Sequence, residues 1–335
     1  MGKLKNIEFL RVFFISSIVM LHMFIDRKWC LCTLFPDITF YQTIKSAIAY
    51  SNNCVEGFFI IAGFLLVYTF KANTGLKDFI LKKYIRLSPV ILFSMGLCAI
   101  GWLLGVMHFK LIPNLLTVLL VNQFGIKFVC GQNPILWYTS VLFAGLLLYF
   151  CIIKYLSPKI KTVIITILII LSYGIIEILQ HGSFANPLKN YYHVFNIGFL
   201  RAVGGIGVGC LLGLLYKREY PLLENKKEKF GIKIFYTLLE IILTLFVFWW
   251  CLFIHSKINN IFIVMVFAIL IMVYVLNKGY LSQYLNKDIW TIFGRYQYSV
   301  YVVHYVIIRI FGLALWKINS DFVYMHPFLP IVIML

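Results

Sequence analysis

The sequence predicts an all-α membrane protein, a polytopic bundle of about ten transmembrane helices within a single domain that spans residues 1–335. Three observations lead to this prediction. Apolar residues make up 62% of the chain and charged residues only 13%. Runs of 18 or more mainly apolar residues recur along the whole chain, which soluble domains of this length do not contain. The lysines and arginines gather in short segments between these runs, as in multi-pass membrane proteins.

The individual spans follow from the apolar runs between polar breaks. The first span is predicted to be retained, because it lacks the small-residue cleavage site of a signal peptide and keeps Arg11 within it. The less hydrophobic segment 110–133 is expected to lie on or dip into the outer face, although a short span is an alternative. The last run ends at Leu335 after about ten residues, so that helix is expected to be incomplete. The predicted helices are 8–25, 47–70, 89–107, 134–153, 161–180, 194–216, 232–253, 260–276, 291–311 and a last one from about 326.

The distribution of cations predicts a cytoplasmic N-terminus, because positive residues favour the cytoplasmic side of a membrane. In this orientation the inner segments carry 18 lysines and arginines, and the outer segments carry eight. The inner cations lie at residues 1–7, 71–88, 154–161, 217–233 and 277–290. The net charge of +18 therefore reflects mainly the orientation of the chain in the membrane, and it gives the chain affinity for anionic membrane lipids. We expect no nucleic-acid partner.

The eight cysteines are scattered, and most lie in apolar runs. Only Cys30 and Cys32 are close in sequence, so we expect neither a disulfide framework nor a metal site. Lysine, isoleucine, asparagine, phenylalanine and tyrosine are used heavily, which is typical of an AT-rich bacterial genome. The expected location is therefore the bacterial cytoplasmic membrane.

Arg11 and His22 lie within the first apolar segment, eleven residues apart. On an α-helix this spacing corresponds to about 1100° of rotation, so both side chains point to one face, about 16 Å apart along the axis. Ionisable residues are costly inside a membrane helix, and a functional role is the first hypothesis for them. Arg11 could instead extend to the lipid headgroups of the inner leaflet, and His22 could form a hydrogen bond that holds two packed helices together.

Four polar residues are predicted to lie at one depth, about 20 Å from the cytoplasmic edge, when each helix is counted at 1.5 Å per residue. These residues are His22, Glu56, Arg201 and His304. Each would be costly alone in lipid, so we expect them to share one polar cavity within about 10–12 Å of a common point. Two alternatives remain open: Glu56 could be a structural partner of Arg201, and His304 could cap the tyrosines around it.

A basic segment, expected to be the end of a cytoplasmic loop, precedes the third predicted helix. Lys82, Lys83 and Arg86 lie within five residues, just before Pro89. Three cations at the mouth of a helix suit an anionic ligand such as a nucleotide phosphate, although the topology rule would also explain them.

Glycines mark the second and sixth predicted helices as closely packed. Gly57 and Gly63 in the second helix should allow a neighbouring helix to approach. The run of glycines in the sixth helix, residues 204–209, is not preceded by a strand, so close helix packing is expected there rather than a nucleotide-binding loop.

The motifs above resemble those of the membrane-bound acyltransferase-3 family, whose members modify cell-surface glycans and related acceptors. The resemblance spans nearly the whole chain. Its most specific part is Asn6-Ile7-Glu8-Phe9-Leu10-Arg11 followed by His22. The segment from Lys83 to Arg86 is similar to the Arg-x-x-Arg element of the family. Lys83 replaces its first arginine, so a bidentate phosphate clamp becomes a point charge.

Further landmarks strengthen this resemblance. The segment 55–64 is similar to the family's Phe-Phe-x-x-Ser-Gly-Phe element, but Ala62 stands where the family has serine, which weakens any role for a hydroxyl there. The segments 136–138 and 294–304 also resemble later landmarks of the family.

The resemblance implies an enzyme, an O-acetyltransferase that transfers an acyl group, expected to be acetyl, from acyl-CoA to a hydroxyl of a cell-surface polysaccharide or lipid-linked glycan. Acetyl-CoA would be the cytoplasmic donor, and no metal is needed. His22 would act as general base or carry the acyl group. The expected catalytic residues are His22, Arg11, Glu56 and His304, the donor-binding residues are Lys82, Lys83 and Arg86, and the acceptor-binding residues are Arg201, Asn53 and Trp137.

The alternative function is a transporter or flippase for a lipid-linked glycan, with the buried polar residues as its transport path. The sequence contains no inverted repeat and no pair of broken helices, and the basic segment has no obvious role in transport. These features favour the enzyme.

Overall fold

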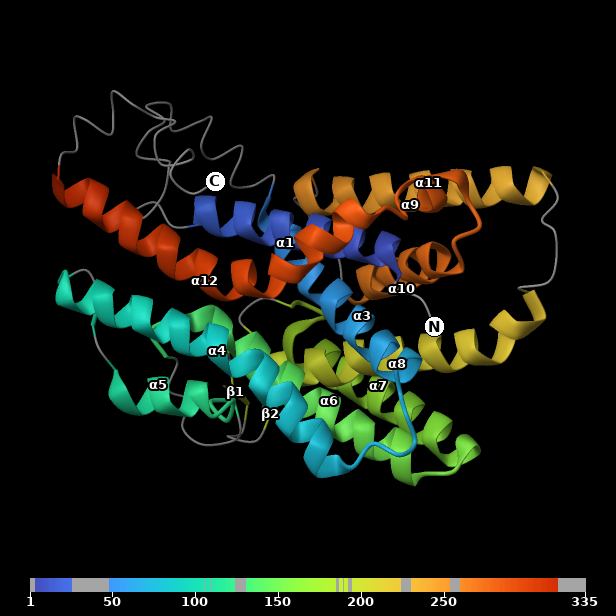
Figure 1. Ribbon diagram of the computed structural model, residues 1–335, viewed down its shortest axis with the longest axis horizontal. Coiled ribbons are helices and arrows are strands. Elements are labelled where there is room, and N and C mark those ends of the chain that lie inside the picture. The colour runs from blue at the N-terminus through green and yellow to red at the C-terminus, as the bar shows by residue number, and fades with distance from the viewer. Residues whose placement is uncertain are drawn as a thin grey trace.

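The computed structural model is a bundle of long α-helices, most of which run close to the long horizontal axis of Figure 1. The structure describes residues 4–25, 48–105, 107–108, 110–123, 131–184, 187–188, 190–191, 195–223, 230–253 and 260–318. The elements, in chain order, are α1 (Lys5–Ile25), η2 (Ala49–Asn53), α3 (Cys54–Tyr68), α4 (Leu76–Leu103), α5 (Leu111–Val118), η3 (Pro134–Leu136), α6 (Trp137–Tyr155), α7 (Pro158–Gln180), β1 (Asn190–Tyr191), β2 (Phe195–Asn196), α8 (Ile197–Leu223), α9 (Phe230–Phe253), α10 (Ile261–Leu276), α11 (Tyr280–Tyr284) and α12 (Asp288–Ile318).

These helices confirm the prediction of a polytopic membrane bundle. Each of the first nine predicted spans coincides with a helix, and the last one, from about residue 326, lies outside the described residues. Within the described part of the chain, seven helices are long and apolar enough to cross a membrane. The two-residue strands β1 and β2 pair antiparallel just before α8. The orientation relative to the cell stays a prediction.

The basic segment is helical, and the expectation of a loop there was wrong. Helix α4 begins at Leu76 and includes Lys82, Lys83 and Arg86, with Pro89 inside it. The sequence before the proline is rich in good helix formers, and Asp78 in the first turn suits the positive end of the helix dipole. The Tyr298 hydroxyl donates to the Leu87 carbonyl at 3.1 Å. The helix thus continues through the proline and packs against α12.

Helices α3 and α8 form the centre of the bundle and pack closely, as the glycines predicted. A Cβ atom at Gly63 would collide with the carbonyl of Ile206, and one at Gly209 would collide with the carbonyl of Ile60. The two backbones therefore touch at glycines contributed by both helices, which is the packing favoured where apolar burial alone does not drive association.

Helices α7 and α9 lie at the edge of the bundle and present apolar side chains outward. Ile170 and Ile178 of α7 are exposed, as are Ile242 and Leu245 of α9. Exposed isoleucine and leucine along a whole helix face suit contact with lipid tails. The positions of these two helices therefore fit a membrane-embedded bundle with its polar residues inside.

The segment around α5 packs through polar side chains. Asn114 donates to Gln132 at 2.7 Å, and Asn133 donates to Ser94 of α4 at 2.9 Å and to the Val302 carbonyl of α12 at 2.8 Å. All of these polar residues are buried. Figure 1 shows α5 beside the end of α4, at the left of the view. These hydrogen bonds join α4, η3 and α12 on that side of the bundle.

Candidate active site

His22 of α1 and His304 of α12 are in direct contact. The Nε2 atom of His304 lies 3.1 Å from the Nδ1 atom of His22, and the ring centroids are 5.1 Å apart. Helices α1 and α12 are neighbours along much of their length. The Tyr305 ring lies edge-on to His22 at 5.6 Å. The structure therefore brings together the two histidines that the sequence predicted to lie at one depth.

The hydrogen bonds around the two rings assign their tautomers. The Nδ1 atom of His304 lies 3.0 Å from the Val300 carbonyl, so it carries the proton and donates to that oxygen. The Nε2 atom of His304 is then the acceptor, and Nδ1 of His22 carries the proton that it shares with His304 and with the Ile18 carbonyl at 3.0 Å. Among the described residues, nothing is hydrogen-bonded to Nε2 of His22. This nitrogen keeps its lone pair for another partner.

Arg11 is held on the same helix by Glu8. One guanidinium nitrogen of Arg11 donates to both carboxylate oxygens of Glu8, at 3.0 and 3.2 Å. The Gln297 side chain of α12 donates to the backbone carbonyl of Glu8 at 3.0 Å. A side chain at Gly294 would collide with the Glu8 carboxylate, so α12 lies directly against this ion pair. Arg11 thus has a fixed direction but also a local counter-ion.

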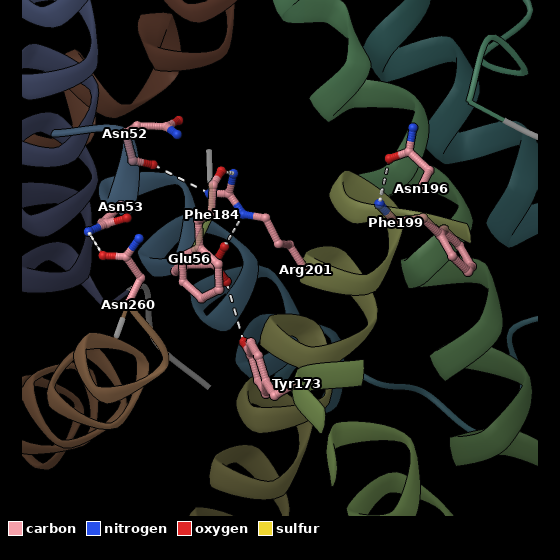
Figure 2. A network of polar contacts seen from close by, with 9 residues as sticks. All are labelled: Asn52, Asn53, Glu56, Tyr173, Phe184, Asn196, Phe199, Arg201 and Asn260. Carbon is pink, nitrogen blue, oxygen red and sulfur yellow. Dashed lines mark hydrogen bonds and ion pairs between the residues drawn. The ribbon is translucent and has the colours of Figure 1, made fainter. Parts of the chain in front are cut away.

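Glu56 and Arg201 form a buried ion pair between α3 and α8, which Figure 2 shows at close range. The Nε atom of Arg201 lies 2.6 Å from Oε1 of Glu56, and both side chains are 0% exposed. The other guanidinium nitrogens donate to the carbonyls of Phe184 at 3.0 Å and Asn52 at 3.4 Å. The Tyr173 hydroxyl donates to Oε2 of Glu56 at 3.3 Å. The alternative of a Glu56–Arg201 partnership is confirmed.

Two predicted acceptor-binding residues lie around this pair. Trp137 of α6 faces the Arg201 guanidinium, with 5.5 Å between the central carbon and the ring centroid. Asn53 donates to the side chain of Asn260 at 3.2 Å, which joins η2 to the start of α10. Asn53 and Trp137 therefore both contact protein groups near Glu56.

Aromatic rings lie between the histidine pair and the ion pair. The Tyr301 ring is 5.9 Å from His304, and the Tyr138 ring is 4.9 Å from Tyr301. Tyr138 also lies within electrostatic range of both Arg11 and Glu56. The four residues predicted to share one cavity are therefore joined as two contacting pairs, with the two tyrosines between them.

Some of these surrounding residues have partial signals in the sequence. Tyr301 is one turn before His304 on the same helix, and Tyr138 follows Trp137, so both could be found from neighbouring motifs. Tyr173 and Phe184 could not, because neither belongs to a motif or to a polar break within a span. Their roles depend on how α7 and the following turn pack against α8.

The basic residues of α4 lie on the surface near the N-terminal part of α12. Lys82 and Arg86 are exposed and one turn apart, and Lys83 is half-buried against the Phe79 ring at 5.5 Å. Within the described part of the chain, none of the three is paired with a carboxylate. Tyr298 lies within electrostatic range of Arg86, and His304 is six residues further along α12, about 9 Å along its axis.

The surface is hollowed where α12 meets the segments before α5 and η3. A cavity of about 250 Å³ lies there, and most of its lining is polar or basic. The lining residues are His108, Lys110, Gln132, Arg309, Met107, Gly131 and Pro134. Pro134 is next to Ile135, whose carbonyl accepts a hydrogen bond from Tyr301 at 3.1 Å. The cavity therefore lies one residue along the chain from the carbonyl that binds Tyr301.

Among the described residues, no group of three or more histidine, cysteine, aspartate or glutamate side chains could hold a metal ion. A family model described as an acyltransferase domain matches residues 4–335. No curated protein and no solved structure matches the chain significantly.

Proposed function

The chain belongs to the acyltransferase-3 family, and from this premise we propose that it transfers an acetyl group from acetyl-CoA to a hydroxyl of a cell-surface polysaccharide or a lipid-linked glycan. Acyl transfer follows from the family itself. The donor, the acceptor and the location in a bacterial cytoplasmic membrane are our proposal. The observation that carries it is the contact between His22 and His304, since a base oriented by a second group is the arrangement that activates a nucleophile.

His22 would act through its Nε2 atom. The lone pair there accepts the proton of the acceptor hydroxyl while the hydroxyl oxygen attacks the thioester carbonyl. The carbon–sulfur bond then breaks, and the imidazolium returns the proton to the leaving CoA sulfur. During this cycle Nδ1–H of His22 stays hydrogen-bonded to Ile18 and His304, which hold the ring and stabilise its positive charge. A second route, in which Nε2 itself carries the acetyl group, uses the same atom.

The donor would enter beside α4 and α12. Lys82, Lys83 and Arg86 present positive charge with no carboxylate partner among the described residues, which suits the phosphates of CoA. The short axial distance from this end of α12 to His304 lets a phosphate-anchored donor extend its thioester toward the histidine pair. Arg11, fixed by Glu8, would guide the donor along α1.

Glu56 and Arg201 would act as positioning residues. Both oxygens of Glu56 and all three nitrogens of Arg201 already have protein partners, so their contribution is to fix α3 against α8 behind the tyrosines. Trp137 and Asn53 would support this arrangement from α6 and η2. The acceptor would approach from the hollowed surface beside α12, where the lining is basic and polar.

A lipid-linked glycan transporter is the competing proposal, because buried polar residues also line transport paths. Radiolabelled acetyl-CoA offered to membranes that contain the full chain separates the two. Label that appears in glycan, and that is lost in a His22→Ala variant present at the same level, supports the enzyme. Membranes in which no glycan becomes labelled although the glycan still moves across the bilayer would support transport.

A further inference from the structure

Cys54 and Cys251 face each other inside the bundle, with their Sγ atoms 3.5 Å apart. Both residues are 0% exposed, and both are free thiols. Cys54 is the first residue of α3, and Cys251 lies two residues before the end of α9. The two positions are 197 residues apart in the chain, so their contact is made by the fold alone.

The backbone on both sides of this pair is fixed by other contacts. The Ser51 hydroxyl of η2 donates to the carbonyl of Cys251 at 3.3 Å. Two residues further along, Asn53 donates to Asn260 at 3.2 Å, where α10 begins. The chain segments that carry the two thiols are therefore held against each other independently of the sulfur atoms, and a covalent bond between them requires only a small movement of the side chains.

Chain order indicates on which side of the membrane the pair lies. If α1 crosses the membrane away from the N-terminal side, α3 begins in the far half, and Cys251 near the end of α9 lies beside it because the two sulfur atoms are in contact. With the N-terminus in the cytoplasm, as the cations predict, this far side is extracytoplasmic. Disulfides form and persist in such oxidising compartments and are rare in the cytosol.

We propose that Cys54 and Cys251 are joined by a disulfide in the mature protein. The sulfur atoms would approach by about 1.5 Å to reach bonding distance. Each thiol loses its hydrogen, one sulfur–sulfur bond forms, and two electrons and two protons pass to the disulfide of an extracytoplasmic thiol oxidoreductase, which becomes a dithiol. Because both side chains are buried in the folded chain, the bond forms during folding, before α9 closes over η2.

Such a bond would attach the α9–α10 part of the bundle to the start of α3, two residues before Glu56. It would close a loop of about 200 residues. A crosslink stabilises the folded state more when the loop is long, because the unfolded chain then loses more conformational freedom. The opposing explanation is that two small apolar side chains fill space and share a weak S–H···S hydrogen bond, which is the usual behaviour of buried cysteine.

The test counts reducible thiols in the full chain, expressed in the membrane and collected without reductant. The protein is denatured in the presence of N-ethylmaleimide, then reduced, and the newly exposed thiols are labelled with maleimide–polyethylene glycol. Compared with the unmodified chain, Cys54→Ser and Cys251→Ser should each lose two labels. Cys210→Ala is the matched control, since this buried thiol contacts the Gly63 carbonyl rather than another sulfur, and it should lose none.

A second measurement does not depend on how the variants fold. Digestion of the unmodified chain without reduction should give a peptide pair that joins Cys54 to Cys251 and separates on reduction. Reduction should also lower the melting temperature of the purified protein, roughly 5–10 °C for a crosslink of this length. Recovery of both peptides in the maleimide-blocked form, or loss of label in only one of the two serine variants, would overturn the proposal.

Discussion

His22 and His304 are 282 residues apart in the chain, and their ring nitrogens meet at 3.1 Å. At that distance one nitrogen must donate and the other must accept, so the two rings cannot both present a proton. The Val300 carbonyl fixes the proton of His304 on its Nδ1 atom. Because Nε2 of His304 must then accept, Nδ1 of His22 carries the proton of that ring, and its Nε2 atom is left as a base. Hydrogen-bond donation in the pair therefore runs in one direction, from His22 of α1 to His304 of α12 and on to the Val300 carbonyl.

The first prediction concerns the two histidines. His22→Ala should reduce acetyl transfer to background, because it removes the atom that accepts the proton. His304→Ala should slow transfer by about 10–1000-fold, the range expected for a group that orients or assists a base. His304→Gln should retain more activity than His304→Ala, since a glutamine oxygen can still accept from Nδ1 of His22. Initial rates with labelled acetyl-CoA measure all three.

His181 provides the matched control for these substitutions. It lies at the end of α7 with a positive φ of 50°, far from α1 and α12 in the chain, and asparagine tolerates that backbone conformation well. His181→Asn should leave transfer unchanged. Full transfer by His22→Ala at equal protein level would exclude His22 as the base.

The second prediction concerns the buried ion pair. Glu56→Gln leaves the Arg201 charge buried without its partner, so the free energy of unfolding should fall by about 3–5 kcal/mol. The double variant Glu56→Gln, Arg201→Met removes both charges and should recover part of that loss. Thermal unfolding in detergent measures both. If the folded fraction of Glu56→Gln transfers acetyl at a rate reduced by about 10–1000-fold, Glu56 orients or assists the reacting groups, as the sequence predicted, and does not serve stability alone.

The sequence predicted the helices well and placed His22 and His304 at one depth, where the structure has them in contact, for a physical reason. Apolar runs of membrane length and polar residues that are costly in lipid are both visible without an alignment. The same reasoning expected four residues in one cavity from their depth alone, and that stays a prediction. Depth does not determine which helices are neighbours: α1 packs on α12 and α3 on α8, so the polar residues meet in pairs.

The error at α4 has a different origin. Pro89 is a strong local signal for a helix boundary, and the cations before it suggested a loop. The helix nevertheless continues through Pro89, where it packs against α12. Tertiary contacts of this kind cannot be read from a local pattern, and neither could the contact between Cys54 and Cys251.

The third prediction concerns helix packing. Gly63→Ala should lower the free energy of unfolding by about 1–3 kcal/mol, because its new methyl group would meet the Ile206 backbone, which cannot move aside as a side chain could. Gly174→Ala on α7 is the matched control, since a Cβ atom there meets nothing within 4 Å. Alanine favours the helix, so that variant should be unchanged or more stable by up to about 1 kcal/mol. Equal stability of the two variants would argue against close contact between α3 and α8.

The fourth prediction concerns orientation. Cysteines introduced at Lys77 and Lys226 should resist a membrane-impermeant maleimide in intact cells, and one at Lys110 should react, in a chain cleared of native cysteines. Lys77 lies at the start of α4, and Lys110 lies beyond its other end, just before α5. Lys226 is outside the described residues. The opposite labelling pattern would invert the topology and would also place the basic end of α4 outside, away from cytoplasmic acetyl-CoA.

The fifth prediction concerns the donor site. Arg86→Glu should raise the KM for acetyl-CoA by roughly 10–100-fold with little change in kcat, because a charged hydrogen bond to phosphate contributes about 1.5–3 kcal/mol to binding. Lys83→Arg should be neutral or mildly improving, since it restores a planar donor that can bind two phosphate oxygens.

Lys77 separates a binding site from general surface charge. It lies on the same helix and at the same end as Arg86, but nine residues earlier, which turns its side chain about 180° away from Arg86. Lys77→Glu changes the net charge by the same amount and should leave the KM for acetyl-CoA unchanged. If both reversals raise KM equally, long-range attraction explains the effect. If neither does, the cations of α4 serve only to orient the chain in the membrane, because a phosphate held by Arg86 must respond to the loss of that charge.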